Sequence, residues 1–308
     1  MKLSLAISTL LCSVVLTMLP CITISICAQD RKPSSKPRFY ALDESRFQIL
    51  YVDQNEQSND WVIPIEFGCR DLQQVAENRL LLGVGAGEAG FREYDLTTRK
   101  IVREVKDAKY AAGSTTALRL PDGRTLISAA HNPNDFYIID AGDNETAHFS
   151  ISGLNTVRCT RLTPRGTILF GSNEEHVYET TLDGKILRDI RIPGAKHVYC
   201  CIEKEDGNLL ASTGYSGFIA EIDKAGNIVK TWGNKPNGEP DSRFHFFASV
   251  QLLKNGNLFV ANWTGHGAKD SDKCPQIYEF DEQGNIVWAW HDPIRAGSIH
   301  NAIMLETD

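Results

Sequence analysis

Turns of similar sequence, each containing a glycine, recur along this chain about every forty residues. They are PDGRTLIS at Gly123, PRGTILFG at Gly166, EDGNLLAS at Gly207 and KNGNLFVA at Gly256, separated by 43, 41 and 49 residues. Apolar runs of strand length precede and follow each turn. A repeat of this length cannot bury its own apolar faces, so neighbouring copies must stack on one another.

A second series of turns falls inside the same units, at Gly184 (TLDGKILRDI), Gly226 (DKAGNIVKTW) and Gly284 (DEQGNIVWAW). Each unit therefore reads strand, turn, strand, loop, strand, turn, strand. A four-stranded repeat of about 40–45 residues is typical of a propeller blade. The sequence thus predicts an all-β fold, a β-propeller built from four-stranded antiparallel blades.

Five complete units can be assigned along the chain. They span residues 68–105, 110–151, 157–192, 197–233 and 245–290. Residues 39–65 supply three further strands, and residues 298–306 supply one that resembles a first strand. We expect these two segments to form a sixth blade together, because that pairing removes the free edges of two partial sheets. Six blades are predicted, with seven as the alternative.

The N-terminal segment differs from the repeats. Residues 1–28 have one lysine, an apolar run and the sequence Ile26-Cys27-Ala28, a pattern typical of a secretory signal peptide. We expect residues 29–38 to form a disordered linker, residues 39–308 to form a single propeller domain, and the mature protein to be secreted or periplasmic. A lipid anchor is the less favoured alternative.

The mature part of the chain has no run of about 18 apolar residues, so no transmembrane segment is predicted. The net charge of -7 argues against nucleic acid as a partner. Five cysteines follow the leader without a CxxC pair, and we expect them to be buried thiols. We expect a monomer whose partner is a small molecule, a glycan or an extracytoplasmic protein.

Candidate site residues follow from the propeller geometry. The starts of the first strands and the loops after the second strands open on one face of the central channel. Polar and aromatic residues at these positions are Arg70, His131, Arg158, His197, Tyr199, Tyr215, His245, Trp263, His266 and His300. The longest blade insertion, residues 265–275, lies over the same opening, and long loops on a rigid scaffold often carry function.

These residues predict a pocket for an anion or a sugar, because arginine pairs with carboxylate or sulfate. A divalent metal held by several histidines is a further option, and its ligands are unknown. The plainer interpretation is that channel residues are solvated and satisfy one another. No organic cofactor is predicted, because the GxGxxG match at residues 85–90 leads into a strand rather than a helix.

The segments GFIAEIDKAGNIVKTW and QIYEFDEQGNIVWAW resemble blades of secreted bacterial six-bladed propellers of the NHL, TolB-like and PQQ-like repeat types. They are similar in particular to the arylsulfotransferase-like group. That resemblance implies sulfuryl transfer, with His245, His300 and Arg158 as the analogous catalytic residues. The blade-end motif typical of PQQ dehydrogenases is absent from the sequence.

Two functional hypotheses follow. The first is a non-catalytic propeller that binds its ligand at the channel mouth. The second is a lyase, hydrolase or sulfotransferase-like enzyme. In the second, Arg158 and Arg70 stabilise an anionic substrate, and one of His197, His245 or His300 acts as general acid or base.

Overall fold

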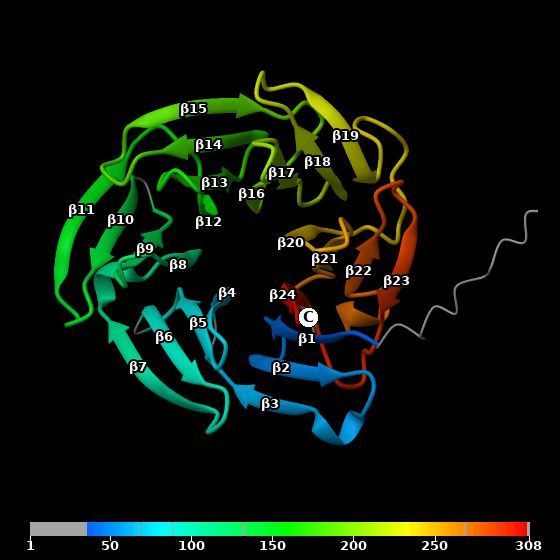
Figure 1. The fold of residues 1–308 in the computed structure, drawn as a ribbon, viewed down its shortest axis with the longest axis horizontal. Coiled ribbons are helices and arrows are strands. Elements are labelled where there is room, and N and C mark those ends of the chain that lie inside the picture. Colours follow the sequence, from blue (N-terminus) through cyan, green and yellow to red (C-terminus); the bar gives the residue numbers. More distant parts are fainter. Residues whose placement is uncertain (1–35, 67, 88, 132, 268, 307–308) are drawn as a thin grey trace, which may run out of the picture. The chain divides into compact units, whose positions relative to one another are not determined.

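Six four-stranded antiparallel sheets are arranged as a ring in the computed structural model, which describes residues 36–66, 68–87, 89–131, 133–267 and 269–306 (Figure 1). The predicted signal peptide and most of the predicted linker lie outside the described residues. The strand β1 begins at Arg38, the last residue of the predicted linker. The six-bladed propeller predicted from the repeats is confirmed.

The blades follow one another along the chain. Blade one contains β4 (Cys69–Ala76), β5 (Arg79–Val84), β6 (Gly90–Asp95) and β7 (Lys100–Lys106). Blade two contains β8 (Thr115–Arg119), β9 (Thr125–Ala129), β10 (Asn134–Ile139) and β11 (Glu145–Ile151). Blade three contains β12 (Val157–Leu162), β13 (Ile168–Ser172), β14 (His176–Thr180) and β15 (Ile186–Arg191).

Blade four contains β16 (Cys201–Glu203), β17 (Leu209–Ser212), β18 (Phe218–Ile222) and β19 (Ile228–Gly233). Blade five contains β20 (Phe247–Leu252), β21 (Leu258–Asn262), β22 (Ile277–Phe280) and β23 (Ile286–Trp290). Blade six has the order β24 (Ile299–Met304), β1 (Arg38–Asp43), β2 (Gln48–Asp53) and β3 (Trp61–Pro64). Three short 3-10 turns complete the described structure: η1 (Gln57–Asn59), η2 (Ala108–Tyr110) and η3 (Asp270–Asp272).

Both ends of the domain meet in blade six. Strand β24 pairs antiparallel with β1, with Phe39 opposite Met304 and Ala41 opposite Ala302. The amide of Leu305 donates to the carbonyl of Arg38 at 2.8 Å, which extends this pairing by one residue. The predicted closure of the ring is therefore confirmed, and the last strand becomes the innermost strand of a blade.

Tight turns between strands use the residues that the sequence indicated. Gly284 has a φ of +88°, a conformation that side chains with a Cβ rarely adopt. In the same turn, the Oδ1 atom of Asp281 accepts the amide of Asn285 at 2.8 Å. These bonds satisfy the backbone locally and fix the register of β22 and β23.

Large aromatic side chains seal the junctions between blades. Phe39 of blade six is fully buried, and its ring centroid lies 5.2 Å from Trp290 and 5.9 Å from Trp288 of blade five. Between blades four and five, the indole of Trp232 donates to the carbonyl of Asp281 at 2.8 Å. The tryptophans of the outer strands thus pack blade against blade.

An ion pair crosses the middle of the channel. Asp71 of β4 accepts two hydrogen bonds from the guanidinium of Arg161 in β12, at 2.8 and 3.2 Å, and one from Asn301 of β24 at 3.2 Å. The carboxylate is fully buried. This contact joins blades one, three and six.

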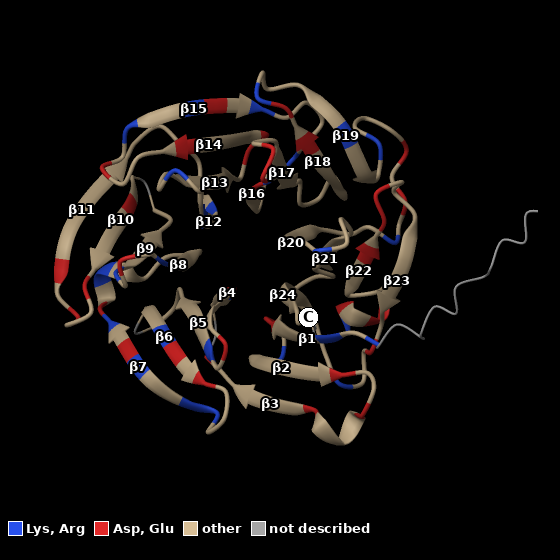
Figure 2. Ribbon diagram, viewed as in Figure 1, with Lys and Arg blue, Asp and Glu red and all other residues tan. Residues whose placement is uncertain are grey.

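Charged residues of both signs are interspersed around the ring (Figure 2). The five described cysteines are all buried and unpaired. In the part of the chain that the structure describes, no helix is long and apolar enough to cross a membrane.

Candidate functional site

One end of the channel gathers an aromatic and charged group of side chains, which we call the mouth cluster. Its members come from the starts of first strands and from the loops after second strands. They are Glu44, Arg70, Arg158, His197, Tyr199, Tyr215, His245, Phe246, Trp263, His266 and His300. Nine of these eleven were candidates from sequence, and the structure brings those nine together.

Four side chains of the mouth cluster form a continuous stack across the channel. The guanidinium carbon of Arg158 lies 5.7 Å from the ring centroid of Tyr199. His300 stacks on Tyr199 at 5.2 Å, and Trp263 stacks on His300, also at 5.2 Å. Each layer comes from a different blade, so the stack ties blades three, four, six and five together at the mouth.

Glu44 is the centre of the hydrogen bonding. It lies in the turn after β1, and its side chain is 3 % exposed. The carboxylate accepts from Arg70 at 2.7 Å, Trp263 at 2.8 Å and His300 at 3.1 Å, and it lies 3.3 Å from the exposed ring of His266. Burial raises the pKa of Glu44, but the bonds and charges of His300 and Arg70 outweigh burial and lower that pKa overall. The Glu44 carboxylate is therefore ionised, and each of its oxygens accepts a hydrogen bond.

Arg158, unlike Glu44, has no charged partner among the described residues. Only 9 % of the residue is exposed, and its Nε atom donates to the side-chain oxygen of Asn173 at 2.6 Å. Within the described residues, its two Nη atoms have no hydrogen-bond acceptor and no carboxylate partner. Burial lowers the pKa of this guanidinium, and the charge of Arg70 lowers it further. A buried cation without a counter-ion is costly and points to an anionic ligand.

The two buried imidazoles are neutral bases. Burial lowers the pKa of His197 to about 3, with the charge of Arg158 acting in the same direction. Burial also lowers the pKa of His300 to about 4, although Glu44 partly offsets this effect. Because Nε2 of His300 donates to the ionised Glu44, its Nδ1 carries the lone pair. The Nδ1 atom of His300 and the Nε2 atom of His197 are both buried without a described partner.

The rim of the mouth is aromatic. Tyr215, between β17 and β18, is 51 % exposed, and its ring lies 4.7 Å from Phe246 and 6.4 Å from Trp263. The ring of His245 lies 6.3 Å from the same tyrosine, and the carbonyl of Trp263 accepts from its Nδ1 atom at 3.0 Å in the tautomer that carries the proton there. The exposed ring of Tyr215 can contact the flat or apolar part of a ligand.

His131 does not join the other candidates. It is exposed after β9, and among the described residues no hydrogen bond, ion pair or ring contact links its side chain to the mouth cluster. Blade two presents small polar residues to the channel, and Thr116 bonds Ser128 at 2.5 Å and Thr160 at 3.0 Å.

Sequence reasoning missed two members of the mouth cluster, Glu44 and Phe246. Glu44 follows β1, which is the second strand of blade six, so it occupies the same kind of loop as Trp263 in blade five. Applying the loop rule to the closing blade would have found it. Phe246 precedes β20 by one residue, and its aromatic character beside His245 was the available signal.

The described side chains do not form a set of ligands for the divalent metal considered from the sequence. Across the described ranges, no group of three or more His, Cys, Asp or Glu side chains is arranged to hold a metal ion. Both oxygens of the Glu44 carboxylate already accept a hydrogen bond, from Arg70 and from Trp263.

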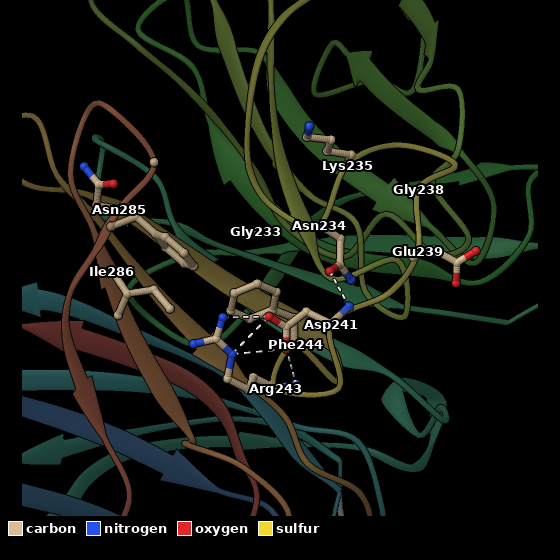
Figure 3. Close-up of a pocket in the computed structure, with 12 residues that line it drawn as sticks. Gly233, Asn234, Lys235, Gly238, Glu239, Asp241, Arg243, Phe244, Asn285 and Ile286 are labelled. Carbon is tan, nitrogen blue, oxygen red and sulfur yellow. Dashed lines mark hydrogen bonds and ion pairs between the residues drawn. The ribbon is translucent and has the colours of Figure 1, made fainter.

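Three cavities lie away from the mouth cluster. One of about 640 Å³ is shown in Figure 3, between β19 and β23, where Arg243 is paired with Asp241. In a second cavity, of about 550 Å³, Arg165 pairs with Glu179 and Glu203. Another, of about 490 Å³, lies at the other end of the channel and is lined by Gln73, Arg161 and Gln251. Their described polar groups are largely satisfied: Arg161 by Asp71, and Gln251 by the backbone of Met304. We therefore place the candidate site at the mouth cluster.

Comparisons with known proteins agree on the fold. No protein-family model and no curated protein matches this sequence. A solved protein of unknown function from Bacteroides caccae superposes with a TM-score of 0.72 at 18 % identity, covering 88 % of this chain and 99 % of that one. A streptogramin B lyase superposes with a TM-score of 0.56 at 14 % identity, over 85 % of each chain. The WD40 propeller domain of Doa1 gives 0.58 at 12 % identity, covering 88 % of this chain and 89 % of that one. At these identities the similarity establishes a β-propeller and nothing finer.

Proposed function

We propose that this propeller binds a small anionic molecule at the mouth cluster. The observation that carries the proposal is Arg158, a largely buried guanidinium whose Nη atoms lack an acceptor among the described residues. Arg70 differs because Glu44 neutralises it. An arginine held in place by Asn173 and Tyr199, with its outer edge unpaired, is prepared to receive an oxyanion.

The surrounding rings support binding of a small molecule rather than a flat protein surface. Phe246 and Trp263 are buried at the base of the mouth, and the exposed Tyr215 stands above them. The side chains of the stack from Arg158 to Trp263 are held by their contacts with one another, so little side-chain entropy is lost on binding.

Isothermal titration of benzoate and of neutral benzamide tests the proposal. We expect benzoate to bind measurably tighter than benzamide, and the difference to vanish in Arg158→Met. The matched control is Arg124→Met, which removes an exposed arginine paired with Asp122. Equal binding of benzoate and benzamide to the wild-type protein would overturn the proposal.

A second candidate function is a lyase. It is favoured by the dyad of Glu44 and His300, in which the carboxylate fixes an uncharged imidazole as a base. The streptogramin B lyase similarity, and the resemblance to arylsulfotransferase-like blades, suggest the reactions to assay. Turnover of streptogramin B or of an aryl sulfate, lost in His300→Gln and His197→Gln, would favour catalysis. Binding without turnover favours the non-catalytic function that we propose first.

We also propose that the protein is exported, on the basis of residues 1–28. Sequencing the N-terminus of the mature protein tests this, with a new terminus near Gln29 as the expected result. An intact Met1 in the purified native protein would contradict it.

A further inference from the structure

We infer that the ligand of the mouth cluster is a monocarboxylate, bound end-on by the Nη1 and Nη2 atoms of Arg158. This inference rests on the proposed anion site and names the chemical class that the site selects. Three features of the described residues carry it: the edge of Arg158 that is available, the net charge around it, and the rings beside it.

The first feature is the geometry of the guanidinium. The Nε atom of Arg158 already donates to the side-chain oxygen of Asn173 at 2.6 Å. The edge formed by Nε and one Nη is therefore not free to bind an oxyanion side-on. The face of the guanidinium lies over Tyr199. What remains is the edge formed by the two Nη atoms. Their parallel N–H bonds can pair with the two oxygens of one carboxylate.

The second feature is the charge that the site can neutralise. Arg70 and Glu44 form a direct ion pair at 2.7 Å and cancel one another. His197 and His300 are buried and uncharged near neutral pH. Arg158 is then the one uncompensated charge contributed by the buried part of the mouth cluster. A singly charged ligand balances it, whereas a dianion brings an excess negative charge near the ionised Glu44.

The third feature is the aromatic wall. Tyr215 exposes half of its surface next to Phe246 and Trp263. Tyr199, over which Arg158 lies, has its ring centroid 5.4 Å from Phe246, so a carboxylate seated on Arg158 would have its remaining atoms on the side of Phe246 and Tyr215. Benzoate is a suitable probe because it combines one planar carboxylate with a flat ring.

Titration calorimetry with four ring compounds at about pH 8 tests the inference, since a phosphate ester is then doubly charged. The probes are benzoate, benzenesulfonate (a tetrahedral monoanion), phthalate and phenyl phosphate (both dianions). We expect benzoate to bind at least about tenfold tighter than either dianion, because one excess charge is left unpaired. We expect benzenesulfonate to fall between them.

The outcomes separate the two claims. If benzoate binds no better than neutral benzamide, the proposed function fails. If anions bind but benzenesulfonate equals benzoate, or phenyl phosphate binds as tightly, then the anion site stands and its assignment to monocarboxylates is overturned.

Changing the charge of the site provides a second test. Glu44→Gln leaves Arg70 uncompensated and raises the charge of the mouth cluster by one. We expect the preference for benzoate over phenyl phosphate to shrink by about tenfold or to reverse. Glu77→Gln, which changes an exposed glutamate after β4, should leave the ratio unchanged. An unchanged ratio in folded Glu44→Gln would overturn the charge argument, and the wild-type comparison decides the inference even if that variant does not fold.

Discussion

The Nε2 atom of His300 lies 3.1 Å from the Oε2 atom of Glu44, and both side chains are almost completely buried. His300 belongs to β24, the last strand of the chain, and Glu44 follows β1, the first strand of the domain. The contact that organises the candidate site therefore also joins the two ends of the propeller. Ring closure and site assembly depend on the same residues.

Glu44 should be among the most sensitive positions for stability. Glu44→Gln keeps the shape of the side chain but removes a buried charge that serves Arg70, His300 and Trp263. We expect the free energy of unfolding to fall by about 3 kcal/mol, because the buried Arg70 and His300 lose a charged acceptor. Urea denaturation followed by tryptophan fluorescence measures this. Glu77→Gln should stay within about 0.5 kcal/mol of the wild type.

The stability of the protein should decrease in mild acid. The pKa values of His197 (about 3) and His300 (about 4) in the folded protein lie below their ordinary value. Between about pH 6.5 and these values, the unfolded chain binds more protons than the folded one, so stability falls as the pH falls. The lowered pKa of Glu44 acts in the same direction at still lower pH.

We expect the free energy of unfolding to fall by roughly 1 kcal/mol per pH unit for each imidazole between about pH 6 and pH 5. Denaturation curves at both pH values give the slope. It should flatten in His197→Gln, while His131→Gln, at the exposed histidine, should retain it. A wild-type stability that is constant over this range would contradict the assignment of both imidazoles as neutral.

Removing one partner of the ion pair between Asp71 and Arg161 should destabilise the protein strongly, whereas replacing both with apolar residues should destabilise it little. Asp71→Asn leaves Arg161 without its charged partner, and we expect a loss of about 3–5 kcal/mol. The double variant Asp71→Leu with Arg161→Met should recover most of that loss. In contrast, removing the exposed pair of Arg124 and Asp122 should cost under about 1 kcal/mol. Equal effects at the two pairs would show that the channel contact is not buried in solution.

Closure of the ring can be tested in β24. The amide of Leu305 points toward β1, so the amide of Ile303, two residues earlier, points the same way. Ile303→Pro removes that donor, and we expect a destabilisation of about 3 kcal/mol or more. Ile303→Val keeps the amide and should have a small effect. Hydrogen exchange of Ile303→Pro should show loss of protection in β1 as well as in β24. A loss confined to β24 would argue against the pairing of the two strands.

The fold was predictable because its signals are local. The turn at Gly284 needs a positive φ, and Asp281 closes it with a side-chain bond, so both residues are fixed by the backbone of their own blade. Glycine turns recur in blades two to five, and their spacing gives the architecture. The pairing of β24 with β1 followed from counting the strands left at each end.

The candidate site was predictable only as a set of positions. Arg70 and Arg158 occupy similar places in their first strands, yet one is neutralised by Glu44 and the other is bonded only to the neutral Asn173. That difference depends on which loops of neighbouring blades reach each guanidinium, and no local pattern encodes it. His131 illustrates the same limit, because it follows a second strand as Trp263 does but lies outside the cluster.

A crystal structure of the protein soaked with 4-bromobenzoate tests the central claim most directly, because the anomalous signal of bromine locates the ligand. The account predicts one carboxylate oxygen within about 3 Å of each Nη atom of Arg158, with the bromine on the side of Tyr215 and Phe246. A ligand bound elsewhere, or a carboxylate seated on Arg70 with Arg158 left unpaired, would contradict it.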